Sequence, residues 1–337
     1  MMKRRTIAAI AVILAVTLVF YATASTENNR STDQPFEATI STLIAEQYPA
    51  EWQNSIQAHG SKDSSVGTEL TKKMEESKSG EFIDVIVLLK SRQHVSSLTS
   101  QKSVVGALRD NNIEIKHQYH IINGITAEIP AESIKEVADL PDVECVYLDR
   151  EIHLIAPIEA EEPAQAGSVG SSGPAELAAE RGEGTEERVW DEGIDGSGIV
   201  VAIIDTGIDK NHPDLYGKII AEKNFVDDAM TADDQNGHGT HCAGIIAGTG
   251  EASGGRYKGV APGALLMNAR ILDSEGNGEL SGLIASIEWA VDNGADVISI
   301  SMGGFNPGDV QSKPECMTVD AAMDAGVVVC TAAGNSG

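Results

Sequence analysis

The chain has 337 residues, enough for two or three domains that each bury a core. It carries 24 Lys+Arg against 51 Asp+Glu, a formal net charge of −27. This balance argues against a nucleic-acid binder, because phosphate contacts need clustered cations, and it disfavours attachment to an anionic membrane surface.

The N-terminus has the three parts of a signal peptide. Lys3, Arg4 and Arg5 precede an apolar run from Ile7 to Tyr21, and Ala22-Thr23-Ala24 supplies small residues at cleavage spacing. The apolar run is short for a membrane span, which needs roughly 20 residues. We therefore expect a signal peptide over residues 1–24 and a secreted protein, with a retained N-terminal anchor as the alternative.

Residues 25–80 form a polar N-terminal segment, in which Thr68–Ser77 predicts a short exposed helix. Residues 81–155 then alternate between strand and helix patterns. Strands are predicted over Phe82–Leu89, Ile113–Tyr119 and Val143–Leu148, and helices over Val95–Arg109 and Ala131–Leu140. Residues His120–Ile129 contain the hairpin turn signal Asn123-Gly124, so a further strand follows that turn. The order β-α-β-β-α-β predicts a small ferredoxin-like α+β domain.

Residues 156–184 are rich in Ala, Gly, Ser, Pro and Glu, which predicts an exposed linker. Residues 185–337 return to alternating strands and helices. Strands are predicted over Gly198–Ile204, Leu265–Leu272, Val297–Met302 and Val327–Ala332, and helices over His238–Gly248, Leu280–Val291 and Met317–Asp324. This alternation predicts an α/β domain with a parallel sheet and helices on both faces.

The four cysteines, at positions 145, 242, 316 and 330, show no CxxC spacing. Disulfides are permitted in an exported chain but are not needed for a core of this size. We expect free thiols, with a Cys316–Cys330 bridge as the alternative.

Two short stretches place polar side chains where chemistry is expected. Asp205 directly follows the apolar run GIVVAII, at the carboxyl end of a buried strand, although an Asp there is often only a turn or capping residue. In NGHGTHCAGIIAG, His238 would begin a helix, an exposed position suited to proton transfer. The spacing of His238, His241 and Cys242 matches no strong zinc pattern, and a packed core histidine is the remaining alternative.

Four segments in register now point to a family. VAIIDTGID (201–209), HGTHCAG (238–244), SMGG (301–304) and AAGNSG (332–337) resemble the motifs of the subtilisin-like serine proteases, the subtilases, in order and spacing. Residues 81–155, including the INGITAEIP hairpin, resemble the inhibitory propeptide of the same family. Together these regions cover about two-thirds of the chain.

The resemblance implies catalytic roles that fit the chemistry of acyl transfer. A serine hydroxyl is a poor nucleophile at neutral pH, so a base must remove its proton during attack. His238 is similar to that base and Asp205 to the residue that fixes its tautomer and stabilises the imidazolium. Asn335 matches the side-chain donor of the oxyanion hole. No cofactor is required for this chemistry.

The resemblance also implies binding residues. Gly278, Ser301, Met302 and Gly303 match the strands that pair with an extended polypeptide substrate. His241 becomes structural. Asp214 matches a structural calcium ligand of many relatives, although the adjoining loop TGEASGGRY (249–257) lacks the usual ligand pattern.

The family's nucleophile lies in a G-T-S-M-A segment, which does not occur in this sequence. We therefore expect a secreted serine endopeptidase made as a zymogen, whose own propeptide inhibits it, but a chain that is inactive as given. A non-catalytic propeptide-type inhibitor or folding helper is the alternative. A sedolisin-type acid protease is disfavoured, because it would carry a glutamate where His238 stands.

Overall fold

The computed structural model describes residues 65–90, 97–154, 189–227, 230–303 and 313–334. The expected signal peptide (1–24) and linker (156–184) fall outside these ranges. The chain divides into two compact units, one built mainly on residues 65–150 and the other mainly on residues 151–303, and each is described by itself. Within the described residues, no helix combines the length and the hydropathy needed to cross a bilayer.

The first unit is an antiparallel sheet with strand order β2-β3-β1-β4. Its elements are α4 (Thr68–Glu76), β1 (Phe82–Leu89), α5 (Ser97–Asp110), β2 (Glu114–Gln118), β3 (Gly124–Pro130), the 3₁₀ turn η1 (Ala131–Ser133), α6 (Ile134–Ala138) and β4 (Val143–Leu148). From β1 to β4 this is the predicted β-α-β-β-α-β order. The prediction of an exposed helix over Thr68–Ser77 is wrong in one respect. Leu70 of α4 is fully buried in the core of this unit.

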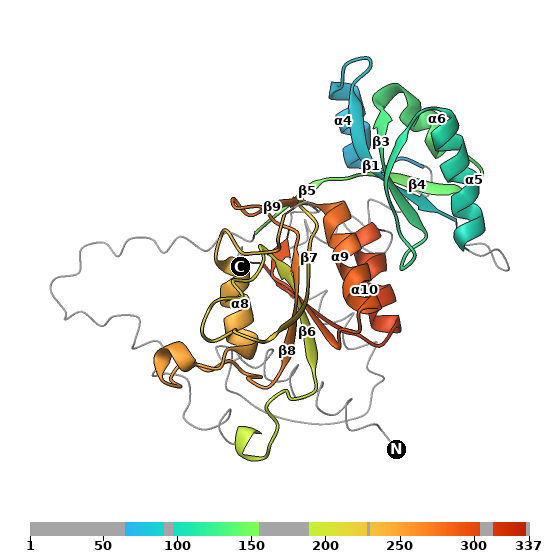
Figure 1. Ribbon diagram of the computed structural model, residues 1–337. Helices are drawn as coiled ribbons and strands as arrows, with labels where there is room; N and C mark the ends of the chain where they lie inside the picture. Colours follow the sequence, from blue (N-terminus) through green and yellow to red (C-terminus); the bar gives the residue numbers. More distant parts are fainter. Residues whose placement is uncertain (1–64, 91–96, 155–188, 228–229, 304–312, 335–337) are drawn as a thin grey trace, which may run out of the picture. The chain divides into compact units, whose positions relative to one another are not determined.

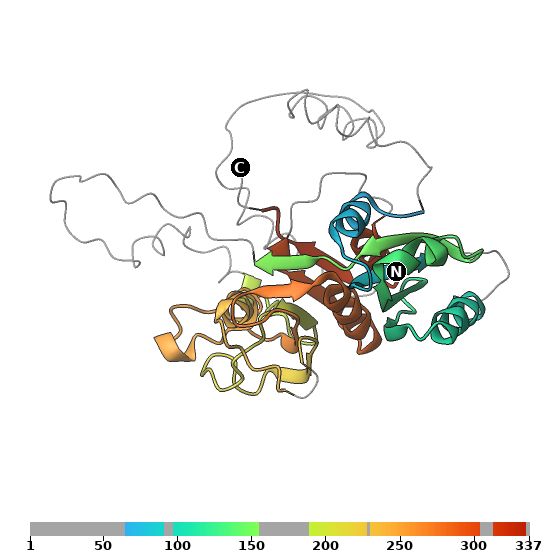
Figure 2. The same ribbon diagram turned by 90° about the horizontal axis from the view of Figure 1, so that it is seen from above.

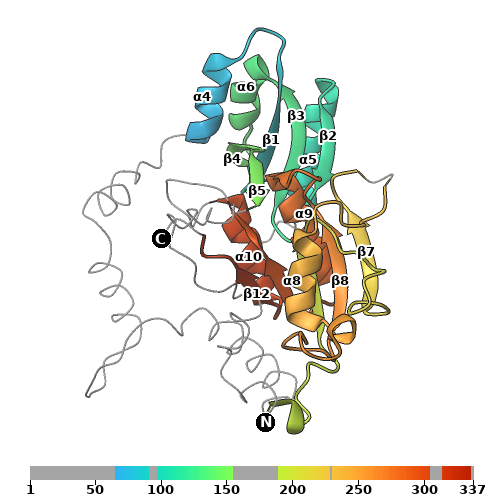
Figure 3. The same cartoon turned by 90° about the vertical axis from the view of Figure 1, so that its left-hand side faces the viewer.

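The second unit contains a parallel sheet with strand order β12-β10-β6-β8-β7. Its elements are β5 (Glu151–Leu154), β6 (Val200–Asp205), β7 (Ile219–Asn224), α8 (His238–Ala247), the 3₁₀ turn η2 (Glu251–Ser253), β8 (Leu265–Arg270), β9 (Asn277–Glu279), α9 (Leu280–Asp292), β10 (Val297–Ile300), β11 (Met302–Gly303) and β12 (Val328–Thr331). Helix α10 (Pro314–Asp324) precedes β12, and its residues 314–321 group with the first unit. Figures 1 and 3 show α8 and α9 on opposite faces of this sheet. The predicted α/β class is confirmed.

The strand predicted over 297–302 is in fact two strands. β10 ends at Ile300, and β11 starts after Ser301 because Met302 and Gly303 pair with β5 instead of continuing the parallel sheet. The sequence pattern does not predict β5, because Val143–Leu148 is the last strand that it indicates before the linker. It lies between β11 and β9 and is antiparallel to both. In Figures 1 and 2, β5 is a green strand among orange and red segments from much later in the chain.

The chain path places this small sheet at one edge of the large one. β8 and β10 are the two neighbours of β6, and β9 and β11 are the next strands after them along the chain. β5 joins β9 to β11 and therefore spans the region beyond the carboxyl end of β6. Ligands of open parallel sheets bind at this edge.

Candidate active site

Asp205 is the last residue of β6 and is buried, with 1% of its surface exposed. Its Oδ1 atom accepts the backbone N–H of Thr206 at 2.7 Å and lies 2.8 Å from Nδ1 of His238. A buried carboxylate needs such partners, because an unpaired charge away from water is costly. The end of β6 therefore places Oδ1 of Asp205 within hydrogen-bond distance of Nδ1 of His238.

His238 is the first residue of α8, and two glycines make its position accessible to Asp205. Gly237 caps the helix with φ of 103°, a left-handed conformation that favours glycine. A Cβ atom on Gly239 would lie 2.2 Å from the carbonyl oxygen of Gly207 and 3.1 Å from Cβ of Asp205. The helix can thus start directly against the end of β6 only with glycine at position 239.

The hydrogen bond that the carboxylate of Asp205 accepts from the ring raises the pKa of His238 well above the ordinary value for histidine, with a further contribution from Cys242, whose Sγ lies 3.8 Å from Nδ1. The carboxylate favours the imidazolium because opposite charges at this distance attract. With Nδ1 held by Asp205, Nε2 of the partly exposed ring is the nitrogen available for proton transfer. The pair has the geometry of a general base with its orienting carboxylate.

A second carboxylate, Asp234, holds the start of α8 in place. It accepts hydrogen bonds of 2.6–2.9 Å from the hydroxyls of Thr206 and Thr240 and from the backbone N–H groups of Asn236, Gly237 and Thr240. The Thr206 hydroxyl also accepts the N–H of Gly239 at 3.0 Å. Sequence analysis missed this role. Its signal was an Asp placed shortly before the helix start, where such residues commonly accept backbone N–H groups.

The four proposed substrate-binding residues lie around β5. Gly278 in β9 pairs with Ile152, and Met302 and Gly303 in β11 pair with Leu154 and His153. Ser301 directly precedes β11, one position after Ile300, which pairs with Ile204 in β6. Ser301 is therefore level with Asp205 at the sheet edge. The structure brings all four residues beside β5, and the position between β9 and β11, here called the groove, is occupied by this extended segment of the same chain.

Comparison with known proteins accounts for this arrangement. The profile of the Subtilase family matches residues 196–337, and that of Peptidase inhibitor I9 matches residues 45–155. The chain carries a subtilase domain with an I9 inhibitor domain before it. β5 lies within the stretch that the inhibitor profile matches, whereas its two partner strands, β9 and β11, lie within the subtilase domain.

Curated relatives are proteases of this family. Serine protease AprX of Bacillus subtilis (strain 168) is 33% identical over 239 residues, covering 68% of this chain and 50% of AprX. Thermitase of Thermoactinomyces vulgaris is 44% identical over 152 residues, covering 44% of this chain and 52% of thermitase. Subtilisin E of Bacillus subtilis (strain 168) is 34% identical over 247 residues, covering 73% and 58%. The chain thus spans about half the length of the curated relatives it matches.

A solved structure agrees on the fold. Fervidolysin from Fervidobacterium pennivorans, a keratinolytic enzyme related to subtilisin, superposes with a TM-score of 0.56 at 26% identity. The match covers 77% of this chain and 41% of fervidolysin, so it includes both the inhibitor region and the subtilase domain.

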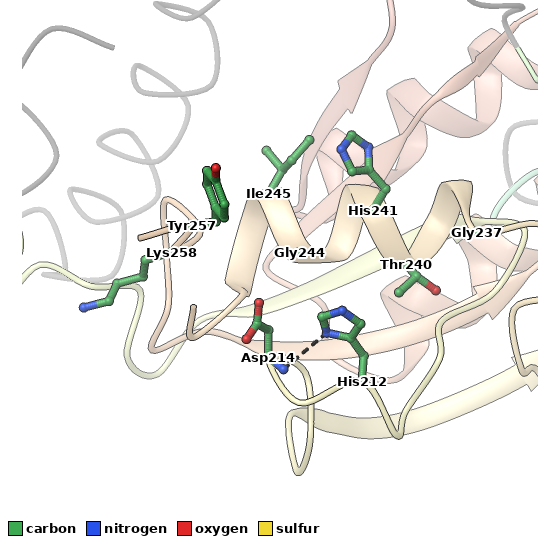
Figure 4. Close-up of a pocket in the computed structure, with 9 residues that line it drawn as sticks. All are labelled: His212, Asp214, Gly237, Thr240, His241, Gly244, Ile245, Tyr257 and Lys258. Carbon is green, nitrogen blue, oxygen red and sulfur yellow. Dashed lines mark hydrogen bonds between the residues drawn. The ribbon is translucent and has the colours of Figure 1, made fainter. Parts of the chain in front are cut away.

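Asp214 does not have the surroundings of a calcium ligand. Its Oδ1 atom accepts the backbone N–H of Ala252 at 2.8 Å, and its carbonyl oxygen accepts that of Thr249 at 3.0 Å. Among the described residues, Asp214 belongs to no group of three or more His, Cys, Asp or Glu side chains whose ligand atoms could share a metal ion. Asp214 instead anchors the loop that contains Thr249 and Ala252. Figure 4 shows it beside His212, on the side of α8 away from His241.

His241 takes no part in the active site of the subtilase domain. In Figure 4 it projects from the outer side of α8, together with Ile245. The three groups that approach one another are Asp205, His238 and Cys242, whose potential ligand atoms lie within 4.8 Å. Within this group, Nδ1 of His238 lies 2.8 Å from Oδ1 of Asp205, which is a hydrogen-bond distance.

All four cysteines are free, as expected, so the alternative Cys316–Cys330 bridge is not formed. Burial raises the pKa of Cys145, Cys316 and Cys330, which disfavours the reactive thiolate at these three positions. Asn335, the expected oxyanion donor, lies outside the described residues. In the described part of the chain, His238 makes no hydrogen bond with a serine hydroxyl.

Proposed function

We propose that this chain belongs to a secreted serine endopeptidase that is made as a zymogen. The observation that carries the proposal is the 2.8 Å contact between Asp205 and His238, at the edge of the sheet where an extended peptide strand is bound. Polypeptides are the proposed substrates, and the inhibitor domain is the proposed intramolecular partner. Export rests on the expected signal peptide over residues 1–24.

His238 is the proposed general base. Its Nε2 accepts the proton of a serine hydroxyl as the oxygen attacks the peptide carbonyl, and later returns the proton to the leaving amine. Asp205 holds the ring with Nδ1 protonated and stabilises the imidazolium that forms between these steps. Asn335 is the proposed donor to the developing oxyanion. The serine itself is proposed to come from a G-T-S segment of the kind that the family uses.

The β5 strand is the proposed product-like inhibitor. Its backbone pairs on both edges, with β9 and with β11, so a substrate cannot occupy the same strands at the same time. The antiparallel pairing with β11 makes β5 run towards Ser301, which is level with Asp205. We infer that processing cuts the chain just after β5. Mass spectrometry of the mature N-terminus tests this position.

The catalytic proposal is tested by fusing the chain to the G-T-S-containing C-terminal region of a relative such as subtilisin E. The fusion should hydrolyse a chromogenic peptide, and His238→Ala should abolish that hydrolysis. His241→Ala is the matched control, since it removes a histidine from the same helix but from the outer side. Equal turnover by the fusion and its His238→Ala variant would reject the role of His238.

An inhibitor or folding helper is the second candidate function. It is favoured by the first unit having a hydrophobic core of its own, which includes Leu70, Val85, Val87, Ile125 and Ile134. Under this alternative, the chain should inhibit a complete relative in trans. If the chain with Asp205→Asn and His238→Ala inhibits as well as the wild type, binding alone explains the inhibition.

A further inference from the structure

Two glutamates lie opposite each other where β5 pairs with β9. Glu151, the first residue of β5, pairs directly with Glu279, the last residue of β9. In an antiparallel pair, directly opposite side chains lie on one face with their Cβ atoms about 4.5–5.5 Å apart. Both carboxylate side chains are exposed, and like charges directly opposite each other destabilise the pairing.

The neighbouring residues prevent Glu151 from moving away along the strand. Ile152 is 3% exposed and lies opposite Gly278, where a Cβ atom would be 2.2 Å from the carbonyl oxygen of Ile271. Leu154 donates its N–H to the carbonyl oxygen of Gly276, and a Cβ atom on Gly276 would be 2.7 Å from Cδ1 of Leu154. A slip of one residue would turn Ile152 out to solvent, so the register is fixed.

No cation offsets this pair within the described residues. Arg150, the nearest cation along the chain, forms an ion pair of 2.9 Å with Glu315. The next residue on the same face of β5 is His153, whose Nδ1 is hydrogen-bonded to Oδ1 of Asn277 at 2.9 Å. Glu279 precedes α9 as its N-cap but makes no capping hydrogen bond with its side chain. The carboxylate of Glu279 can therefore interact with the side chain on the strand opposite it, at the position of Glu151.

We propose that Glu279 is a specificity-determining residue that selects a basic residue in the substrate. β5 serves as a stand-in for substrate, so this inference rests on the proposed function. Consider a peptide with Lys or Arg at the position of Glu151 and an aliphatic residue at the position of Ile152. Its basic side chain is attracted to Glu279, whereas Glu151 of the protein's own β5 is repelled by Glu279. The protein thereby holds its inhibitory strand less tightly than a basic substrate of the same shape.

The test changes residue 151 in the full chain and follows amide exchange of Leu154 by NMR at pH 7.5. Glu151→Lys should slow exchange by about two- to fivefold at low salt, because it replaces repulsion with attraction across the pair. Adding Glu279→Gln to Glu151→Lys should remove most of that gain. Glu136→Lys, on the exposed face of α6, is the control, since it changes the net charge equally without touching the groove.

Each outcome decides between the proposals. If Glu151→Lys slows exchange no more than Glu136→Lys, or if the gain survives Glu279→Gln, the role of Glu279 is rejected. Raising the salt to about 0.5 M should reduce the gain, because exposed charges are screened. Exchange of Leu154 at the rate of an unstructured peptide in the wild-type chain would instead refute the occupied groove, and with it the proposed inhibition.

Discussion

Asp205 and His238 lie 33 positions apart in the chain, yet Oδ1 of one is 2.8 Å from Nδ1 of the other. The contact exists because a strand ends where a helix begins. Gly239 lets the two backbones touch, and Thr206 links both to Asp234. The position of the base is therefore set by the ends of two elements and does not depend on a long loop.

Replacing Asp205 by Asn should lower the pKa of His238 towards the ordinary histidine value of about 6.5, because the carboxylate that favours the imidazolium is lost. The amide is nearly isosteric, so the fold should survive. Titration of the imidazole resonances by NMR measures the effect, with His241 as an internal reference. An unchanged pKa of His238 would show that the contact does not exist in solution.

The same hydrogen bond makes stability depend on pH. The pKa of His238 is raised in the folded state, so its stabilising contribution is complete below the unfolded value of about 6.5 and is lost as pH rises through the higher folded value. His238→Gln should therefore lower Tm more at pH 5.5 than at pH 9. His241→Gln is the control, and its effect on Tm should not follow this trend. A His238→Gln deficit that grows with pH would contradict the sign.

The sequence predicted the main strands and helices because buried elements show a characteristic spacing of apolar residues. The continuous apolar run of β6 predicted a strand covered on both faces, and the helical stripe of α9 predicted a covering helix. β5 left no such signal. It has only four residues, and its partners at 277–279 and 302–303 are joined to it through backbone hydrogen bonds, which residue types do not encode. Asp234 was missed for a related reason, since most of its donors are backbone N–H groups.

Asp234 offers a test of the support around the base. Burial alone would raise its pKa, but hydrogen bonds from Gly237, Thr240 and Asn236 together hold it below the ordinary value. Its stabilising contribution is present above the unfolded value of about 3.9 and is lost as pH falls through the folded value. Asp234→Ala should cost about 1–3 kcal/mol in urea unfolding at pH 7, because several donors lose their acceptor.

A positioning role for Asp234 predicts more than lost stability. Asp234→Ala should also lower the pKa of His238, since the start of α8 no longer holds the ring against Asp205. Asp234→Asn keeps one acceptor oxygen and should recover part of both effects. If Asp234→Ala destabilises the chain but leaves the pKa of His238 unchanged, Asp234 stabilises the loop without positioning the base.

The loop anchored by Asp214 should be independent of calcium. Asp214→Asn keeps an oxygen that can accept the N–H of Ala252, so we expect a Tm change of no more than a few degrees. Asp214→Ala should cost more, because the N–H of Ala252 loses its acceptor. Both variants and the wild type should unfold at the same temperature with millimolar calcium and with chelator. A rise in wild-type Tm with calcium that Asp214→Asn abolishes would restore the calcium site.

Ile152 should be the main anchor of the inhibitory strand. It is 3% exposed, and truncating a buried Ile to Ala costs about 2–5 kcal/mol. Ile152→Ala should therefore release β5 from β9 and β11 while leaving the parallel sheet folded, because β6 gains its burial from other partners. Trypsin cleavage after Arg150, at the border of β5, reports this release and should accelerate at least about tenfold, since each 1.4 kcal/mol changes the open population tenfold. His153→Ala, at the exposed neighbouring position, should change cleavage little. Equal acceleration by the two variants would mean that the strand is held by its backbone pairing and not by the buried side chain.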